Sequence, residues 1–318
     1  MKVLITGITG FAGSHLADYI LEHIKGAKIF GIERPRSRRD NVKHIRERIK
    51  FFDCDIKDYS SVKLIMKKIK PDLVFHLAAQ TFVPTSWTAP TETLATNILG
   101  ELNIFEAVRD VGINPRIQIA GSSEEYGFVC KKDLPIKETC PLKPLSPYAV
   151  SKIGQDYLAY QYVKSYGLKA IATRGFNHTG PRRGESFVCS NFAMQIVKIE
   201  KKLQSPKIKV GNLDAIRDFT DVRDMVKGYW MILQKGKPGD VYNICSGEGI
   251  RIRDVLKELL SLSNIKIKVE EDKKRRRPSD VPVLIGDNSK VRRQTGWKPE
   301  IPFKNTLRDL LRWWRENI

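Results

Sequence analysis

The chain has 318 residues, 41% of them hydrophobic, and carries a formal net charge of +20. This length suits one large α/β unit or two domains that share a cleft, and the apolar content is enough for a sizeable core. No apolar run reaches the roughly 18 residues that a membrane-spanning helix needs, and the first strand begins so early that we expect no signal peptide.

The cysteines indicate the cellular compartment of the protein, and the charge indicates which kinds of partner it can bind. The five cysteines are scattered, odd in number and without a C-x-x-C pair, so we expect reduced thiols in a cytoplasmic protein and no metal site. The positive charge admits a nucleic-acid partner. However, lysines and arginines are interleaved with acids, and only residues 273–277 form a compact basic run, without a helix-turn-helix or zinc pattern. An anionic small substrate explains the charge equally well, so we expect neither nucleic acid nor a membrane as the main partner.

A strand, a glycine turn and a helix open the chain. Residues 3–5 form an apolar run without alternation, which is typical of a buried parallel strand, and residues 14–24 show helical periodicity. Between them lie the turn residues Gly7, Gly10, Phe11 and Gly13. Glycines let the backbone approach a pyrophosphate, and the amides at a helix start favour its charge. The G-x-x-G-x-x-G spacing also fits an ordinary tight turn, but its position between strand and helix favours a bound dinucleotide.

The predicted second strand, residues 28–32, ends beside an acid and two arginines. An acid at this distance from the glycine turn often binds the adenosine ribose hydroxyl, whereas a neighbouring arginine can bind a 2′-phosphate. Glu33 therefore favours NAD, and Arg34 and Arg36 favour NADP. We favour NADP as the cofactor and leave NAD as the alternative.

Strand-like and helix-like segments continue to alternate up to residue 175. Such alternation with short connections predicts an α/β fold with a doubly wound parallel sheet and right-handed crossovers. The predicted strands are residues 49–52, 73–77, 116–120 and 170–173, and the predicted helices are residues 60–69, 97–110 and 147–166.

The pattern is less regular after residue 175, where loops rich in Pro, Gly and Arg appear. The strand at 240–244 is expected to return to the main sheet. We predict a dinucleotide-binding domain of residues 1–175 plus about 219–244, and a smaller substrate-binding domain of about 176–218 plus 245–318. The other elements expected here are helices at 191–201, 221–233, 252–262 and 304–318 and strands at 208–210 and 265–269.

Tyr148 and Lys152 lie one helical turn apart, on one face of the predicted helix. A lysine ammonium there would lower the pKa of the phenol, and such a tyrosine can exchange a proton with a substrate oxygen. Two other Tyr/Lys pairs have this spacing, but Tyr148 also opens its helix and follows a strand that ends in Ser122 and Ser123. A serine at that strand end can hydrogen-bond the same substrate oxygen, so we predict catalysis rather than a polar turn.

Together these motifs resemble an extended short-chain dehydrogenase/reductase. The glycine turn, Leu77-Ala78-Ala79-Gln80, the serine loop and Tyr148-x-x-x-Lys152 occur in order. Residues 174–181, 211–219 and 277–281 are similar to the GDP-mannose branch of that family, and the resemblance spans essentially the whole chain. It implies a Rossmann-type sheet that binds the cofactor and a smaller C-terminal α/β domain that binds a nucleotide sugar.

The resemblance also implies roles for individual residues. Ser122, Tyr148 and Lys152 are implied to be catalytic, and Glu124 aligns with a catalytic base. Arginines are implied to clamp the diphosphate and nucleoside, a role that suits their forked donors, and no residue is implied to bind a metal. The implied cofactor contacts are Gly7, Gly10, Phe11, Gly13, Glu33, Arg34, Asp55, Ile56, Leu77, Ala78, Ala79, Tyr148, Lys152 and Asn177. The implied substrate contacts are Ser122, Ser123, Asn177, Arg183, Val188, Asn212, Arg217, Arg277 and Asp280.

Two activities of this branch compete. Glu124 and residues 181–185 favour GDP-mannose 4,6-dehydration. Ser122, where the dehydratase pattern has threonine, and the short segment ahead of Arg277 favour reduction of a 4-keto sugar, as does the likeness of residues 277–286 to the reductase. We favour an NADPH-dependent reductase that converts GDP-4-keto-6-deoxy-D-mannose to GDP-D-rhamnose. A dehydratase, a bifunctional enzyme and a non-catalytic binding protein are the alternatives.

The resemblance also bears on assembly. Homologues associate through helices similar to residues 97–110 and 147–166. A homodimer is therefore implied, with a tetramer as the alternative.

Overall fold

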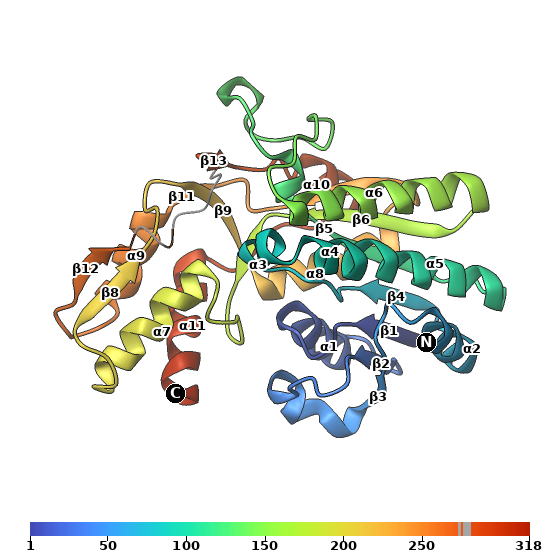
Figure 1. The fold of residues 1–318 in the computed structure, drawn as a ribbon, viewed down its shortest axis with the longest axis horizontal. Helices are drawn as coiled ribbons and strands as arrows, with labels where there is room; N and C mark the ends of the chain where they lie inside the picture. Colours follow the sequence, from blue (N-terminus) through green and yellow to red (C-terminus); the bar gives the residue numbers. More distant parts are fainter. Residues whose placement is uncertain (273–274, 276–280) are drawn as a thin grey trace.

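The computed structural model of the chain describes residues 1–272, 275 and 281–318. Within that part, the largest sheet has seven strands, all parallel, in the order β10–β6–β5–β4–β1–β2–β3 (Figure 1). The strand order reverses between β1 and β4, which is where open α/β sheets bind ligands. The predicted doubly wound α/β fold is confirmed. The strands are β1 (Lys2–Thr6), β2 (Lys28–Glu33), β3 (Ile49–Asp53), β4 (Leu73–His76), β5 (Arg116–Ser122), β6 (Lys169–Gly175) and β10 (Val241–Ile244).

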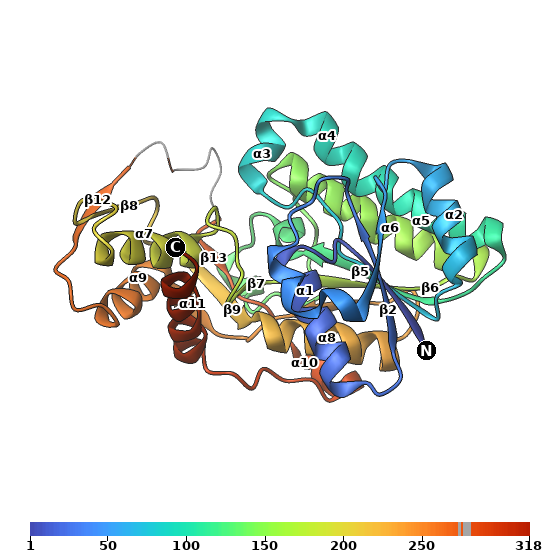
Figure 2. The same cartoon turned by 90° about the horizontal axis from the view of Figure 1, so that it is seen from below.

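Helices cover both faces of this sheet (Figures 1 and 2). On one face α1 (Phe11–His23) packs against α8 (Val222–Lys235), and α10 (Ser289–Thr295) contributes to the same apolar core. The other face is covered by α2 (Tyr59–Ile69), α5 (Gly100–Val111) and α6 (Pro147–Tyr166), which enclose a second core. Because both faces are buried, the strands are apolar without alternation.

The segment before α5 differs from the single predicted helix at 97–110. It contains α3 (Val83–Thr88), α4 (Pro90–Leu94) and one turn of π-helix at Ala95–Leu99 before α5 begins. Three short 3₁₀ helices also occur in the first half of the described chain: η1 (Asp40–Arg48), η3 (Ser123–Tyr126) and η4 (Lys131–Asp133).

A smaller group of elements lies beside the large sheet, at the left of Figure 1. Its strands are β7 (Asn177–Thr179), β8 (Lys207–Val210), β9 (Ile216–Asp221), β11 (Gly249–Arg251), β12 (Lys268–Glu271) and β13 (Val283–Leu284). β9 pairs with β7, β11 and β13, and β8 pairs with β12. Three helices, α7 (Val188–Glu200), α9 (Ile252–Ser261) and α11 (Phe303–Asn317), build an apolar core with β8 and β9.

The predicted return of the chain to the main sheet is confirmed, because β10 pairs in parallel with β6. Another expectation was wrong: β12 begins at Lys268, three residues after the predicted strand start. The predicted domain boundaries stay a prediction. Within the described part of the chain, every helix is too short or too polar to span a bilayer.

Candidate active site

The turn after β1 is shaped by close backbone contacts. Gly7 has φ +70°, in the left-handed region, and a Cβ there would lie 2.9 Å from the backbone of Ala78. A Cβ on Gly13 would lie 2.3 Å from the carbonyl oxygen of Gly7. Gly10 is the N-cap of α1 and offers no side chain to its first amides. The turn therefore forms a cradle of backbone groups in which an anion can approach a helix start.

A cavity of about 430 Å³ opens beside this turn. Ser122, Ser123, Glu124 and Arg183 are among its lining residues. The structure thus brings the predicted catalytic residues and the predicted cofactor contacts to one cavity. The predicted cofactor contacts that line it are Gly7, Gly10, Phe11, Gly13, Glu33, Arg34, Asp55, Ile56, Leu77, Ala78, Ala79, Tyr148, Lys152 and Asn177.

Two carboxylates of the predicted cofactor site have partners within the chain. Glu33 accepts hydrogen bonds at both of its oxygens from Arg39 Nε, over 2.8 and 3.1 Å. Asp55 accepts a hydrogen bond from the backbone amide of Lys57, over 2.9 Å. The Glu33 carboxylate, which was expected to bind a ribose hydroxyl, is thus held by an arginine in this structure.

Ser122, Tyr148 and Lys152 converge from β5 and α6. Ser122 ends β5 and caps η3, and its hydroxyl accepts a hydrogen bond from the amide of Glu124, over 3.2 Å. Tyr148 lies in the first turn of α6, and the Nζ of Lys152 lies 5.8 Å from the centre of its ring. This Nζ donates to the carbonyl oxygen of Ala120, over 2.7 Å, so the lysine is tied to β5.

The electrostatics of the pair differ from the expectation in one respect. Burial raises the pKa of Tyr148, and a hydrogen bond with Ser122 opposes that rise only in part. The expected lowering of this pKa by Lys152 is therefore wrong for this structure, because loss of hydration dominates. Burial also lowers the pKa of Lys152 to about 8, against the favourable charges of Glu101 and Glu125.

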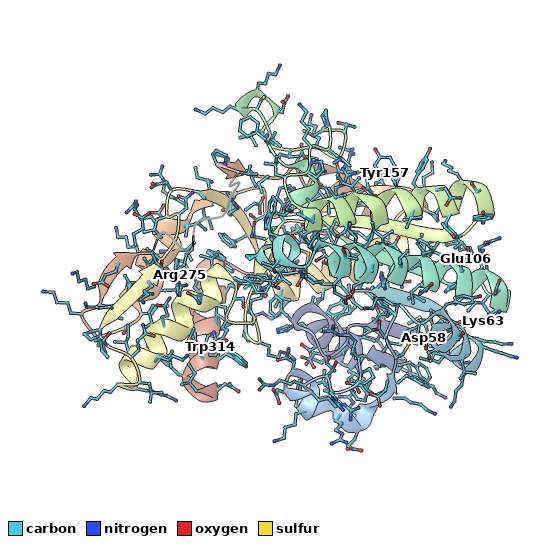
Figure 3. All side chains as sticks on the ribbon, viewed as in Figure 1. Asp58, Lys63, Glu106, Tyr157, Arg275 and Trp314 are labelled. Carbon is cyan, nitrogen blue, oxygen red and sulfur yellow. The ribbon has the colours of Figure 1, made fainter. Side chains whose placement is uncertain are left out.

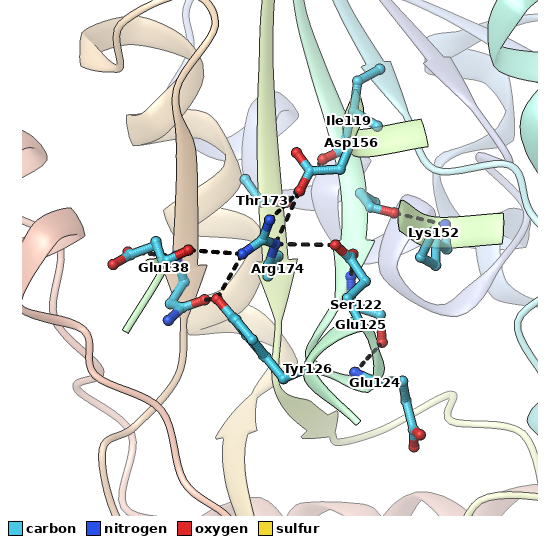
Figure 4. A network of polar contacts seen from close by, with 12 residues as sticks. Ile119, Ser122, Glu124, Glu125, Tyr126, Glu138, Lys152, Asp156, Thr173 and Arg174 are labelled. Carbon is cyan, nitrogen blue, oxygen red and sulfur yellow. Dashed lines mark hydrogen bonds and ion pairs between the residues drawn. The ribbon is translucent and has the colours of Figure 1, made fainter. Parts of the chain in front are cut away.

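A buried polar network supports the end of β5 (Figure 4). Glu125 accepts a hydrogen bond from the amide of Ser122 over 2.7 Å and another from Arg174 Nε over 3.0 Å. Arg174 also pairs with Asp156 of α6 and donates to the Tyr126 hydroxyl over 3.1 Å. The carboxylate of Glu124 points away from this network (Figure 4). The network fixes β5 against α6, and therefore Ser122 against Tyr148, while Glu124 faces the cavities.

A second cavity, of about 580 Å³, adjoins the first. Asn177, Arg183, Glu124 and Phe187 line both cavities and form part of their common wall. Among the other predicted substrate contacts, Val188, Asn212 and Arg217 line the second cavity. Ser122 and Ser123 line only the first cavity, and Arg277 and Asp280 lie outside the described residues.

Arg183 lies where the two cavities meet. Its guanidinium carbon is 4.7 Å from the ring centre of Phe11 and 3.4 Å from that of Phe187. Burial lowers its pKa to about 10, and its Nε has no hydrogen-bond partner among the described residues. A cation held between rings with an unused donor is suited to bind an anion at this junction.

Comparison with known proteins decides the family. A family model described as GDP-mannose 4,6 dehydratase matches residues 4–310. The chain belongs to this family. Two relatives, one named a reductase and the other a dehydratase, are similar to the chain over nearly all of its length. One is a GDP-6-deoxy-D-mannose reductase from Pseudomonas aeruginosa, 33% identical over 318 residues that cover 100% of this chain and 98% of the relative. The other is a GDP-mannose 4,6-dehydratase from Vibrio cholerae, 33% identical over 347 residues that cover 97% and 92%.

Solved structures have the same fold as this chain. The structure of RMD from Pseudomonas aeruginosa complexed with NADPH superposes with a TM-score of 0.88 at 32% identity, covering 100% of this chain and 99% of that chain. A UDP-glucose 4-epimerase from Thermotoga maritima gives a TM-score of 0.89 at 26% identity, with the same coverage. The motif resemblance to an extended short-chain dehydrogenase/reductase of the GDP-mannose branch is confirmed.

Some residues of the site were not predicted from the sequence. Arg275 lines the second cavity in the smaller group of elements (Figure 3), where it donates to Asn191 over 2.9 Å. It belongs to the basic run in which the sequence pointed only to Arg277. Glu125 and Arg174 were not assigned a role because nothing in the linear sequence pairs residues 49 positions apart.

Proposed function

We propose that the protein is an NADPH-dependent reductase that converts GDP-4-keto-6-deoxy-D-mannose to GDP-D-rhamnose. The observation that carries the proposal is the meeting of Ser122, Tyr148 and Lys152 with the glycine turn in one cavity. A second cavity with arginines in its lining adjoins it. The similarity to a GDP-6-deoxy-D-mannose reductase supports the choice of substrate.

In this proposal, Ser122, Tyr148 and Lys152 each have a separate role in the reduction. Ser122 positions the C4 ketone and Tyr148 gives a proton to its oxygen as that oxygen becomes an alcohol. Lys152, tied to β5 through Ala120, keeps a positive charge beside the phenol. When bound, the reduced nicotinamide supplies the hydride.

The residues at the glycine turn fit such a dinucleotide. The cradle formed by Gly7, Gly10 and Gly13 leaves backbone amides of α1 uncovered, which suits a pyrophosphate. Arg34 lines the cavity beside the end of β2, as a 2′-phosphate requires. The similar RMD from Pseudomonas aeruginosa was solved as a complex with NADPH, which supports the same choice.

For the substrate, we propose that Arg183 and Arg217 bind the diphosphate and nucleoside and that Val188 and Asn212 contact the same nucleotide. Arg217 is 8% exposed and lines the second cavity, so water competes little with a ligand for its guanidinium. Arg277 and Asp280 remain part of this proposal through the motif that contains them.

A GDP-mannose 4,6-dehydratase is the second candidate. Glu124 lines both cavities and its carboxylate points away from the Arg174 network (Figure 4). A carboxylate so placed can remove a proton from the sugar, which dehydration requires and simple reduction does not.

One experiment separates these activities. The pure protein is incubated with GDP-mannose alone and, separately, with GDP-4-keto-6-deoxy-D-mannose plus NADPH, and products are followed by chromatography and NADPH absorbance. We expect turnover only in the second reaction. Consumption of GDP-mannose without added NADPH would support the dehydratase, and turnover in both would support a bifunctional enzyme.

The matched control is Tyr148→Phe, which removes the proton donor and leaves the ring. We expect its turnover to fall by at least about 100-fold while NADPH binding, measured by nicotinamide fluorescence, changes little. Near-normal turnover would contradict the role of Tyr148.

We also propose a homodimer and a cytoplasmic location. The exposed Tyr157 and Val150 on α6 support an apolar contact between two copies. All five cysteines lie within the described part of the chain and are free thiols, which supports a reducing compartment.

A further inference from the structure

Glu33 occupies the position at which a carboxylate selects NAD. It is the last residue of β2, it lines the cofactor cavity, and only 3% of its surface is exposed. An unpaired carboxylate there would accept hydrogen bonds from a ribose hydroxyl and repel a 2′-phosphate. The position therefore conflicts with the NADPH that the proposed function requires.

Arg39 resolves this conflict by binding the carboxylate. Its Nε reaches both oxygens of Glu33, over 2.8 and 3.1 Å, and its Nη2 donates to one of them as well. The guanidinium also lies 5.0 Å from the ring centre of Phe51 and 4.0 Å from Asp53. A hydrogen-bonded charge pair held this way leaves Glu33 little capacity to accept from another donor.

The loop that carries Arg39 leads into η1, whose first turn is fixed to the glycine turn. The side chain of Asn41 donates to the carbonyl oxygen of Thr9 over 3.1 Å, and Arg182 donates to the carbonyl oxygen of Asn41 over 3.0 Å. Arg34 and Ser37 of the same loop line the cavity. The loop thus presents a cation and a hydroxyl to the cofactor and holds Arg39 against the carboxylate.

We propose that Arg39 masks Glu33 and thereby makes this cofactor site select NADP over NAD. Arg39 acts as a positioning residue, because it neutralises the carboxylate and need not touch the cofactor. The inference rests on the proposed function, since it concerns the affinity for NADPH. It predicts that unmasking Glu33 moves the preference toward NADH.

The test is direct binding of NADPH and NADH to the pure protein, measured by nicotinamide fluorescence and by calorimetry. In Arg39→Ala we expect NADPH to bind about ten-fold more weakly and NADH about three-fold more tightly, because the free carboxylate repels phosphate and accepts from the hydroxyl. The matched control is Arg38→Ala, which removes an arginine whose side chain is 90% exposed and paired with Asp40. Its NADPH/NADH affinity ratio should equal that of the wild type.

The double variant Glu33→Gln/Arg39→Ala shows whether Arg39 acts by masking Glu33 or by contacting the 2′-phosphate of the cofactor directly. With no carboxylate left to mask, the double variant should recover NADPH binding to within about three-fold of the wild type. Weak binding in the double variant would overturn the proposal and make Arg39 a phosphate ligand. Arg39→Gln, which keeps a donor toward Glu33 without the charge, tests the same shift if Arg39→Ala does not fold.

The outcomes distinguish this inference from the proposed function. A wild-type protein that binds neither dinucleotide contradicts the proposed function itself. A wild-type protein that prefers NADPH, with an unchanged affinity ratio in Arg39→Ala and Arg39→Gln, contradicts only the masking by Arg39.

Discussion

Lys152 is a buried residue of the site whose charge is sensitive to pH. It is 3% exposed, and burial lowers its pKa to about 8, although Glu101 and Glu125 favour the ammonium. An unfolded lysine keeps its proton up to a pH of about 10.4. Between these values the unfolded chain binds more protons than the folded chain, so the contribution of this lysine to stability rises with pH.

We therefore expect kcat of the reduction to fall as the pH rises through about 8, while the contribution of Lys152 to stability rises. The measurement is a pH profile of kcat beside melting temperatures over the same range. Lys164→Met removes an exposed lysine of the same helix and should leave the fall in place. A kcat that stays constant to a pH well above 9 would mean that the charge of Lys152 is not needed.

For single residues, the sequence predicted which side chains lie in the site but not which of them pair with one another. Gly7, Asp55, Lys152 and Asn177 all line one cavity, as their motifs indicated. The pairing of Glu33 with Arg39 could not be predicted, because four neighbouring arginines in the same loop compete for one acid. The sign of the shift at Tyr148 was missed because it depends on burial, which a sequence spacing does not report.

Among the elements, the β1–α1 turn leaves almost no room for added side-chain atoms. In Gly13→Ala the added Cβ would lie 2.3 Å from the carbonyl oxygen of Gly7 and 2.8 Å from the Cα of Ile8, both backbone atoms. We expect a loss of about 1–3 kcal/mol in the free energy of unfolding, from denaturant titration. NADPH binding should weaken by more than about ten-fold because the cradle opens.

The control for that variant is Gly184→Ala. A Cβ at Gly184 meets no atom within 4 Å, so stability and NADPH binding should stay close to the wild type. Equal behaviour of Gly13→Ala and Gly184→Ala would contradict the role given to the turn.

Elements with a plain apolar run or a clear capping signal were predicted well. β1 follows from its apolar run, and α6 follows from the cap residue Ser146 and from Pro147 in its first turn. β9 was missed because Arg217, Asp218 and Asp221 are buried in it, which hides the apolar pattern of a strand. Asp218, for example, accepts from Ser246 and Gly247, so tertiary contacts allow a polar sequence to form this strand.

For the whole molecule, the exposed face of α6 predicts the assembly state. Tyr157 (labelled in Figure 3) is 61% exposed, Tyr160 51% and Val150 46%, which is a large exposed apolar area for one helix. We expect the wild type to have twice the mass of one chain by light scattering, and Tyr157→Glu to shift toward the monomer. Leu203→Glu, at a residue 66% exposed beyond α7, should leave the mass unchanged. A monomeric wild type would contradict the proposed homodimer.

The strand β10 closes the edge of the large sheet next to β6, yet the chain reaches it only after building α7, β8 and β9. α8, which precedes β10, supplies Val226 and Tyr229 to the core on the α1 face. A protein truncated after β6 would thus expose that core and lack an outer strand. We therefore expect substrate specificity to change through individual loops and side chains, and not through exchange of either half of the chain.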